Sequence, residues 1–366
     1  MNPINVGIIG CGNVSSQYLN AAKFFQSFRI SALADLELSR AEARAAEYGV
    51  EHAMSVDDLL ASDVDLIINL TIPDAHARVS KQILDAGKAV YSEKPLGTVR
   101  EDAKPILDTA ESKGLRVGCA PDTFLGAGLQ TSRKVIDDGW IGEPLGASAF
   151  MTSRGMEMWH PDPTFFYQPG AGPLFDVGVY YVTALVHLLG PVAKVAGTAK
   201  ASFAERTVTS QPNFGAKIPV NTPTHISGLL SFESGAVGTL MTTFDVWASE
   251  LPRLELYGSE GTLSVPDPNT FGGPVRIKRA GASEWTELPL THGYTENSRG
   301  LGVADIAHAL LSGRPHRASG ALAYHVLDIM QSTLEAAEAE RTLPLSSRAE
   351  RPAPLPLGLI EGILDE

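Results

Sequence analysis

The stretch "VGIIGCGNVSS", residues 6–16, decides the fold class, because it joins an apolar strand to a helix through a glycine-rich turn. Residues 4–9 are apolar enough for a buried strand, and residues 15–25 have helical spacing. The alternation continues with strands expected at 30–35, 65–71, 88–92 and 115–120, and with helices expected at 39–49 (ending at Gly49), 75–87 and 100–114. Alternation of this kind predicts a parallel sheet with helices on both faces.

The glycine turn predicts a dinucleotide site. Gly10 permits a tight turn, and Gly12 lets a pyrophosphate approach the backbone at the helix N-terminus. Ser15 stands where the fingerprint has its third glycine and is small enough for close helix–strand packing. We expect Asn13 and Val14 in the same loop to contact the cofactor. The alternative is a glycine-rich turn in some other α/β fold.

Asp35 favours NAD over NADP. It ends the second expected strand, about twenty residues after the loop, where a carboxylate can accept both ribose hydroxyls. A carboxylate there would repel a 2′-phosphate, and the next residue is Leu36 rather than arginine. Arg40 lies one helical turn further on, so NADP stays open.

Two further loops are expected beside the cofactor, because ligands bind beyond the carboxyl ends of such strands. These loops are "TIPDAH" (71–76) and "SEKPLG" (92–97), and the second places a lysine directly after a buried strand. The residues expected to contact the cofactor here are Thr71, Ile72, Pro73, His76, Glu93 and Lys94. For His76 the alternative is a histidine in the first turn of the next helix that contacts nothing. Lys94 is expected near the nicotinamide end.

The pattern changes after residue 122. Long alternating runs separated by "ESGAVG" and "YGSEGT", which are typical of hairpin turns, predict a mostly antiparallel sheet. Helices are expected at 301–312 and 320–340. The predicted fold class is therefore α/β, with an N-terminal dinucleotide-binding domain at 1–122 and an α+β domain at 123–366 that carries a large open sheet. We expect the second domain to bind substrate and to mediate oligomerisation.

Composition narrows the functional classes. The chain has 366 residues, a formal net charge of −13 and two cysteines. The negative charge argues against a nucleic-acid or anionic-membrane partner, and Cys11 and Cys119 are expected to be structural. No stretch resembles a signal peptide or a membrane span, so a cytoplasmic protein is expected. No cluster of histidine, cysteine or carboxylate residues has metal-ligand spacing.

Together, "GIIGCGNVSS", Asp35, "TIPDAH", "SEKPLG" and "GAGPLFDVGVYY" resemble the glucose–fructose oxidoreductase, inositol dehydrogenase and MocA family. The likeness covers nearly the whole chain, in the order of a Rossmann domain followed by an open sheet, and Glu-Lys-Pro is its most specific motif. The resemblance implies NAD or NADP as cofactor and hydroxyls of sugars, cyclitols or their derivatives as substrates. It also implies that Lys94 is catalytic and that the Lys94–Pro95 peptide is cis.

The family usually adds an aspartate and a histidine four residues apart on a helix of the second domain. Asp176 matches the aspartate, but Tyr180 occupies the histidine position and Thr183 the position of a second acid. The usual proton relay is therefore in doubt. Two histidines are candidates to replace the missing one: His160, in the aromatic loop "MWHPDPTFFYQPGAGP", and His187, seven residues after Tyr180. The alternatives are an aromatic loop that is only structural and a core or surface histidine.

The sequence therefore predicts an NAD(P)-dependent oxidoreductase that moves a hydride between nicotinamide and a sugar or cyclitol carbon. Lys94 takes the proton, oriented by Asp176, and Tyr180 hydrogen-bonds the substrate hydroxyl. The alternatives are an NAD-retaining glycoside hydrolase of the same fold and a non-catalytic NAD sensor. Strands such as "GLLSFESGAVGTLMTTFDVW" carry apolar residues on both sides, which predicts a homodimer or homotetramer packed sheet to sheet.

Overall fold

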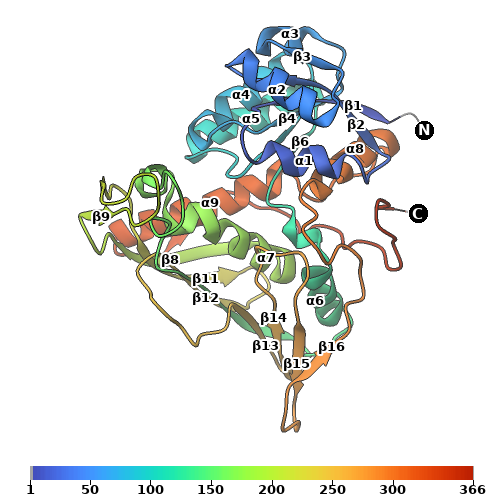
Figure 1. The fold of residues 1–366 in the computed structure, drawn as a ribbon. Coiled ribbons are helices and arrows are strands. Elements are labelled where there is room, and N and C mark those ends of the chain that lie inside the picture. Colours follow the sequence, from blue (N-terminus) through green and yellow to red (C-terminus); the bar gives the residue numbers. More distant parts are fainter. Residues whose placement is uncertain (1–2, 366) are drawn as a thin grey trace. The chain divides into compact units, whose positions relative to one another are not determined.

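The computed structural model describes residues 3–365, and the chain divides into two compact units (Figure 1). Unit 1 contains Met1–Ala127, Thr291–Tyr324 and Pro352–Glu366, and unit 2 contains Gly128–Leu290 and His325–Arg351. This division differs from a single boundary after residue 122, because two later segments return to unit 1.

Unit 1 is built on a six-stranded parallel sheet with the order β3-β2-β1-β4-β5-β6. Its strands are β1 (Ile4–Ile9), β2 (Phe28–Ala34), β3 (His52–Met54), β4 (Leu66–Asn69), β5 (Ala89–Ser92) and β6 (Val117–Cys119). Its first five helices are α1 (Ser15–Ala21), α2 (Leu38–Tyr48), α3 (Val56–Ala61), α4 (Pro73–Asp85) and α5 (Arg100–Lys113), and a 3₁₀ turn, η1 (Thr123–Leu125), follows β6. The predicted parallel sheet is confirmed. The strand order brings the carboxyl ends of β1, β4 and β5 side by side.

The two later segments join unit 1 through buried contacts. Helix α8 (Leu301–Ser312) packs against β1, β2 and β6, as Figure 1 shows for the orange helix beside the blue strands. The buried carboxylate of Asp122 accepts hydrogen bonds from the amides of Gly300 and Gly302, each at 2.9 Å. In the C-terminal segment, Asp365 accepts a 2.9 Å bond from Arg317. Asp122 therefore anchors the start of α8, a structural role that the sequence did not predict.

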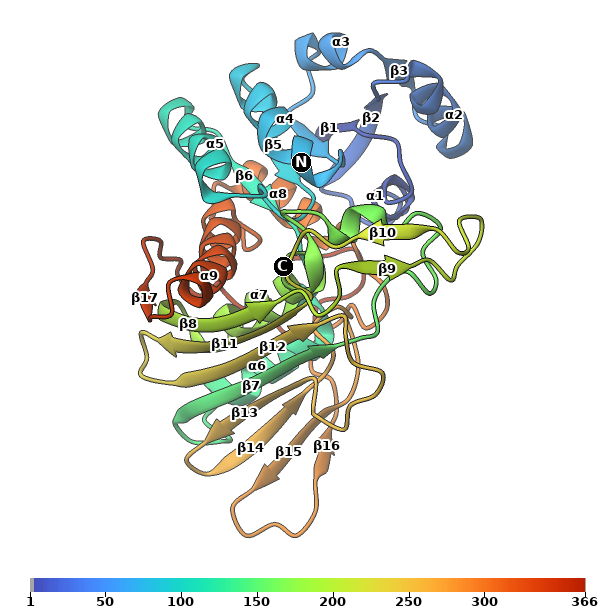
Figure 2. The same cartoon turned by 90° about the vertical axis from the view of Figure 1, so that its left-hand side faces the viewer.

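Unit 2 contains a nine-stranded sheet with the order β16-β15-β14-β13-β7-β12-β11-β8-β17 (Figure 2). Its pairs are antiparallel except β7–β12, so the mostly antiparallel sheet is confirmed. The strands are β7 (Pro144–Thr152), β8 (Val192–Lys200), β11 (His225–Phe232), β12 (Val237–Thr243), β13 (Leu254–Gly258), β14 (Gly261–Val265), β15 (Val275–Arg279), β16 (Thr286–Leu288) and β17 (Leu343–Pro344). A separate ribbon pairs β9 (Glu205–Thr207) with β10 (Lys217–Pro219).

Helices cover one face of this large sheet. They are α6 (Ala127–Asp137), α7 (Val179–Leu189) and α9 (Gly320–Glu338), and α9 begins in unit 1 and continues into unit 2. Short helical turns are η2 (Thr164–Tyr167) and η3 (Leu174–Gly178). A Cβ atom on Gly178 would lie 2.9 Å from the methyl group of Thr242, so this glycine lets the chain approach β12 closely. On the opposite face, Leu229 and Val237 stay 60% and 62% exposed.

His325 links α9 to the sheet and predicts how stability depends on pH. Its buried Nε2 accepts the amide of Val192 at 3.1 Å, and its Nδ1 lies 2.8 Å from the hydroxyl of Ser347. This pattern requires a neutral ring, and burial lowers the pKa of His325 below its ordinary value. The unfolded chain therefore takes up the proton first, so this stabilisation is present above about pH 6.5 and is lost as the pH falls.

We predict that the free energy of unfolding falls on acidification from neutral pH, and that His325→Gln reduces this slope. One such group contributes at most about 1.4 kcal/mol per pH unit. Urea unfolding at pH 7.5 and 5.5 measures the difference, and His52→Gln, at an exposed position of β3, is the control. An equally steep fall in His325→Gln would contradict the prediction.

Candidate functional site

Glycine is favoured at two positions of the loop after β1, and the physical cause differs between them. Gly10 has φ of +104°, and a Cβ atom there would lie 2.6 Å from the carbonyl oxygen of Leu70. Gly10 is therefore required by the packing of the chain itself. A Cβ atom on Gly12 would meet nothing within 4 Å. The open space above Gly12 fits a ligand that must come close to the backbone, as a pyrophosphate does.

Asp35 lies beside the same loop. Its carboxylate accepts the amide of Cys11 at 2.8 Å and the amide of Glu37 at 3.0 Å. Burial, and then the charge of Asp35, raise the pKa of the Cys11 thiol to about 11. Cys119 is also a buried free thiol, and burial raises its pKa. Both cysteines are therefore protonated packing groups at neutral pH.

Two arginines of α2 lie near this loop. Arg40, the residue because of which NADP stayed open as the cofactor, pairs with Glu37 at 2.9 Å. Arg44 reaches the carbonyl oxygen of Gly12 at 3.4 Å and pairs with Glu47 at 2.9 Å. The sequence analysis missed Arg44, although its position four residues after Arg40 places both on one face of the helix.

The loop after β4 is organised by the buried amide of Asn69. Its oxygen accepts the amide and the hydroxyl of Thr71, at 3.2 and 2.7 Å, while its nitrogen donates to the carbonyl of His76 and the hydroxyl of Ser80, at 2.9 and 3.0 Å. Ile72 stays exposed, and Pro73 is the first residue of α4. Sequence reasoning did not single out Asn69, since it falls inside the strand expected at 65–71.

His76 ties two loops together. Its buried ring has Nδ1 at 2.7 Å from the carbonyl oxygen of Pro95 and Nε2 at 2.9 Å from that of Thr71. Burial lowers the pKa of His76 below its ordinary value. His76 lies in the first turn of α4, as the alternative expectation had it, but it is not without contacts. That it contacts the cofactor stays a prediction. It connects the "TIPDAH" loop to the "SEKPLG" loop.

Glu93 and Lys94 follow β5 directly. The carboxylate of Glu93 accepts the hydroxyl of Tyr18 at 2.8 Å and the amide of Lys94 at 3.0 Å. The amide of Glu93 donates to the carbonyl of Asn69 at 2.9 Å, which joins this loop to the end of β4. The Lys94–Pro95 peptide is cis, so that expectation is confirmed. Lys94 thus leaves the sheet at the edge where the glycine loop also lies.

In unit 2, Asp176 and Tyr180 lie at a change of helical geometry. Asp176, which is partly exposed, belongs to η3, a π-helical turn, whereas Tyr180 belongs to α7 and is 9% exposed. The sequence predicted one regular helix with both side chains one turn apart. The wider π turn changes this, because four residues complete less than one π turn.

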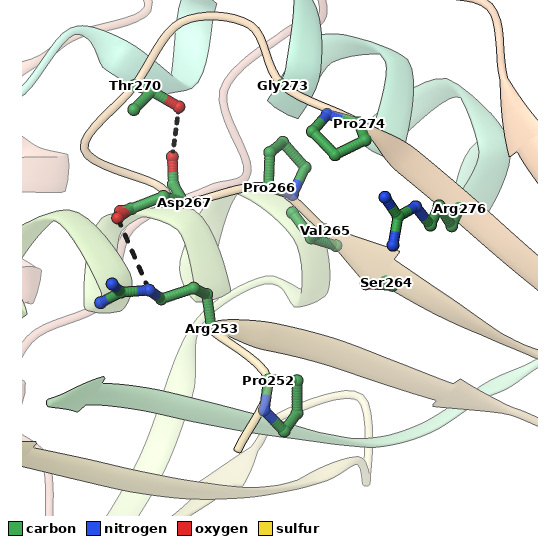
Figure 3. A pocket seen from close by; sticks show the side chains of 10 residues that line it. All are labelled: Pro252, Arg253, Ser264, Val265, Pro266, Asp267, Thr270, Gly273, Pro274 and Arg276. Carbon is green, nitrogen blue, oxygen red and sulfur yellow. Dashed lines mark hydrogen bonds and ion pairs between the residues drawn. The ribbon is translucent and has the colours of Figure 1, made fainter. Parts of the chain in front are cut away.

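The neighbouring Tyr181 donates a hydrogen bond to Asp267, one of the residues that line the pocket in Figure 3. Its hydroxyl lies 3.4 Å from Asp267, which also pairs with Arg253 at 3.9 Å. Asp267 and Arg253 line a pocket of about 380 Å³, and no residue predicted for the site lines it. Burial raises the pKa of Tyr181, so its hydroxyl stays protonated at neutral pH.

The aromatic loop places His160 among three rings. The ring centroids of Trp159, Phe165 and Phe166 lie 5.5, 5.9 and 5.1 Å from that of His160, and its Nδ1 accepts the amide of Asp162 at 3.1 Å. Trp159 stays 64% exposed. The loop thus offers an exposed aromatic face next to a histidine.

Buried pairs fix the base of this loop. The hydroxyl of Tyr167 donates to Glu157, and Arg206 pairs with Glu157 at 3.1 Å. Sequence reasoning missed Glu157 and Arg206, which are distant in the chain and carry no local pattern. His187, by contrast, is fully buried in α7, with the amide nitrogen of Gln130 at 3.5 Å from Nε2.

Among residues 3–365, no three histidine, cysteine, aspartate or glutamate side chains gather so that they would hold a metal ion. Within the same residues, no helix is long and apolar enough to cross a membrane, and the compartment predicted from the sequence remains a prediction.

The parallel sheet of order 3-2-1-4-5-6, the glycine loop and the acid at the end of β2 define a dinucleotide-binding unit. Residues 4–120 match the model described as the oxidoreductase family with an NAD-binding Rossmann fold, and residues 129–264 match that of the GFO/IDH/MocA C-terminal domain. The chain belongs to the GFO/IDH/MocA family of oxidoreductases, and its N-terminal domain binds NAD(P).

Named relatives share most of this chain. The dTDP-3,4-didehydro-2,6-dideoxy-alpha-D-glucose 3-reductase of Actinomadura kijaniata is 28% identical and covers 86% of this chain and 90% of its own. Inositol 2-dehydrogenase of Rhizobium meliloti (strain 1021) is 23% identical and covers 78% and 82%. A levoglucosan dehydrogenase structure with NADH and L-sorbose has a TM-score of 0.81 at 21% identity, covering 95% and 100%. At this identity the structural likeness shows the fold.

The glycine loop yields a paired prediction. Gly12→Ala should leave the melting temperature unchanged, because the added Cβ meets no protein atom, but should weaken NADH binding about tenfold or more. Gly10→Ala should instead destabilise the chain by about 1–3 kcal/mol, since its φ is positive and Leu70 is in the way. Thermal unfolding and NADH fluorescence titration measure both effects. Unchanged NADH affinity in Gly12→Ala would contradict the assignment of this loop.

Proposed function

We propose that this protein is an NAD(P)-dependent oxidoreductase that interconverts a hydroxyl and a carbonyl group on a sugar, a cyclitol or a sugar derivative. The placement of Lys94 is the observation that carries the proposal. Its main chain is held at the carboxyl end of β5, at the same sheet edge as the glycine loop. The names of two relatives, an inositol dehydrogenase and a deoxysugar-nucleotide reductase, support the substrate class.

Lys94 is the proposed acid and base. Oxidation of an alcohol removes a hydride from carbon and a proton from oxygen, and bound nicotinamide supplies the hydride acceptor. The amine of Lys94 takes the hydroxyl proton, and the positive charge of oxidised nicotinamide favours the uncharged amine that this step needs. In the reductive direction Lys94 returns the proton to the carbonyl oxygen.

Asp35 supports NAD as the preferred cofactor. A carboxylate at the end of β2 accepts ribose hydroxyls and repels a 2′-phosphate. Arg40 is already paired with Glu37, which reduces its availability to a phosphate. NADP is the alternative that a comparison of the two cofactors tests.

Unit 2 contributes the groups proposed to handle substrate. Tyr180 donates a hydrogen bond to the substrate hydroxyl, since a phenol stays protonated at neutral pH. Trp159 and His160 offer an aromatic face and a polar group for a sugar ring. That Asp176 orients Lys94 stays a prediction, because the two residues belong to different units.

A spectrophotometric screen tests the function. Sugars and cyclitols, with myo-inositol and levoglucosan among them, are incubated with NAD and with NADP, and reduced nicotinamide is followed by absorbance. We expect one equivalent of reduced cofactor per oxidised product. Release of a free sugar from a glycoside without net reduced cofactor would instead indicate a hydrolase. Cofactor binding without any turnover across the panel would favour a sensor.

Lys94 and Tyr180 should differ in their effect on turnover. Lys94→Ala should lower kcat by about 10³-fold, because it removes the acid–base group, while NADH affinity stays unchanged. Tyr180→Phe should cost only about tenfold, since it loses one hydrogen bond and no proton acceptor. Steady-state kinetics and NADH titration measure both. Near-normal turnover in Lys94→Ala would overturn its role, and unchanged rates in Tyr180→Phe across the pH range would make His160 the next residue to test.

The helix-free face of the large sheet is the proposed contact between copies of this chain. Leu229 and Val237 project from neighbouring strands β11 and β12, and Tyr257 of β13 is partly exposed on the same face. Exposed apolar side chains that gather on one face are typical of a protein partner surface. We therefore infer a homodimer or homotetramer that packs through this face.

Light scattering at micromolar concentration tests the assembly. The wild-type mass should be at least twice that of one chain, and the double variant Leu229→Lys, Val237→Lys should shift it toward the monomer. Leu357→Lys, at an exposed leucine of the C-terminal segment, is the control and should change nothing. A monomeric wild-type protein would contradict the inference.

A further inference from the structure

The main-chain amide of Lys94 is bonded to the adjacent Glu93, whose carboxylate is also bonded to a side chain from a distant part of unit 1. One carboxylate oxygen of Glu93 accepts the Lys94 amide at 3.0 Å, and the other accepts the hydroxyl of Tyr18 at 2.8 Å. Tyr18 lies on α1, the helix that follows the glycine loop, 75 residues earlier in the chain. The three groups form a continuous path from α1 to the proposed base.

The hydrogen bond from Tyr18 to Glu93 joins a neutral donor to a carboxylate in a buried setting. Tyr18 is almost fully buried, and a hydroxyl that donates to a carboxylate in a buried setting makes a charge-assisted bond. Burial, and then the charge of Glu93, raise the pKa of Tyr18 far above its ordinary value. The hydroxyl of Tyr18 therefore stays protonated at neutral pH and can donate to Glu93.

The neighbouring Tyr91 shows that a buried tyrosine hydroxyl in this core does not have to be hydrogen-bonded. Tyr91, on β5, is also fully buried, and its ring contacts that of Tyr18 with the centroids 6.3 Å apart. Within residues 3–365, the Tyr91 hydroxyl has no hydrogen-bond partner. Of these two adjacent buried tyrosines, only Tyr18 bonds to Glu93 through its hydroxyl.

Pro95, the residue that follows Lys94, is held as well. The carbonyl oxygen of Pro95 lies 2.7 Å from Nδ1 of His76 and accepts a hydrogen bond from it in the tautomer that carries the proton on Nδ1, which bonds the dipeptide at its amide and at its carbonyl. A lysine amine is carried on a four-carbon stem, so a displacement of the main chain moves the point from which the amine can reach a substrate. Acid–base groups that are displaced by about 1 Å lose much of their effect on rate.

We propose that Tyr18 is a positioning residue: through Glu93 it fixes the main chain of Lys94 and thereby the place of the lysine amine. The inference rests on the proposed acid–base role of Lys94. It assigns Tyr18 a role that neither the glycine-loop pattern nor the Glu-Lys-Pro motif contains.

The matched variants Tyr18→Phe and Tyr91→Phe test this assignment, because each removes one buried hydroxyl and keeps the ring. The first readout is competitive acetylation with acetic anhydride, followed by peptide mass spectrometry. It compares the reactivity of Lys94 with that of Lys88, which lies just before the same strand and donates to the carbonyl of Val64 at 3.1 Å. Tyr18→Phe should change the Lys94 to Lys88 ratio about threefold or more, and Tyr91→Phe should leave it as in the wild type.

The second readout is kinetic and uses the best substrate of the screen. Tyr18→Phe should lower kcat about tenfold with NADH affinity unchanged, and should raise the isotope effect of a carbon-deuterated substrate, since the chemical step becomes slower. A merely structural loss would reduce the amount of active protein and leave the isotope effect unchanged. Should Tyr18→Phe fold poorly, Glu93→Gln removes one of the two bonds and should shift the same readouts.

The outcomes separate this inference from the proposed function. Equal behaviour of Tyr18→Phe and Tyr91→Phe in Lys94 reactivity and in kcat would overturn the role of Tyr18. Full turnover in Lys94→Ala would overturn the proposed role of Lys94 instead. The acetylation ratio does not depend on turnover, so it reports on positioning whether or not the screen finds a substrate.

Discussion

The buried amide of Asn69 is the constraint on which the cofactor edge of unit 1 depends. An asparagine amide offers two donors and two acceptor positions, and all four are used here, on Thr71, His76 and Ser80. The main-chain carbonyl of Asn69 also accepts a hydrogen bond from the amide of Glu93. A buried amide with every bond made has a single low-energy arrangement, so the loops after β4 and β5 take one conformation relative to each other.

The conformation of the glycine loop is constrained by the same region through a close backbone contact. Leu70, next to Asn69, presents the carbonyl against which Gly10 packs, and only a residue without a Cβ atom fits there. Asp35 then fixes the far side of the loop by accepting the Cys11 amide. Polar bonds on one side and a close backbone contact on the other leave Gly12 as the open position. Rigidity around an open position is what a dinucleotide pocket needs.

Local signals of the sequence predicted much of this fold, and contacts between distant residues account for what it missed. Gly49 ends α2 in a left-handed conformation, and α8 spans 301–312 as expected, because glycine caps and apolar periodicity act within a few residues. Three-residue β3 has too little pattern to detect. The pairing of Tyr18 with Glu93 and of Asp122 with the start of α8 spans 75 and 178 residues, and no local motif encodes either pair.

Tyr180 occupies the position of the histidine that the family usually has, and the side chains that could replace it in the proposed mechanism have different surroundings. His187 has the surroundings of a core residue, because its ring is fully buried in α7 and its main-chain carbonyl accepts a hydrogen bond from Arg133 at 2.9 Å. Tyr181 points its hydroxyl toward Asp267 and keeps its proton. His160 differs from both, since it borders the exposed ring of Trp159. In the proposed mechanism, a chain that lacks the usual histidine depends more heavily on Lys94, whose main-chain amide is bonded to Glu93.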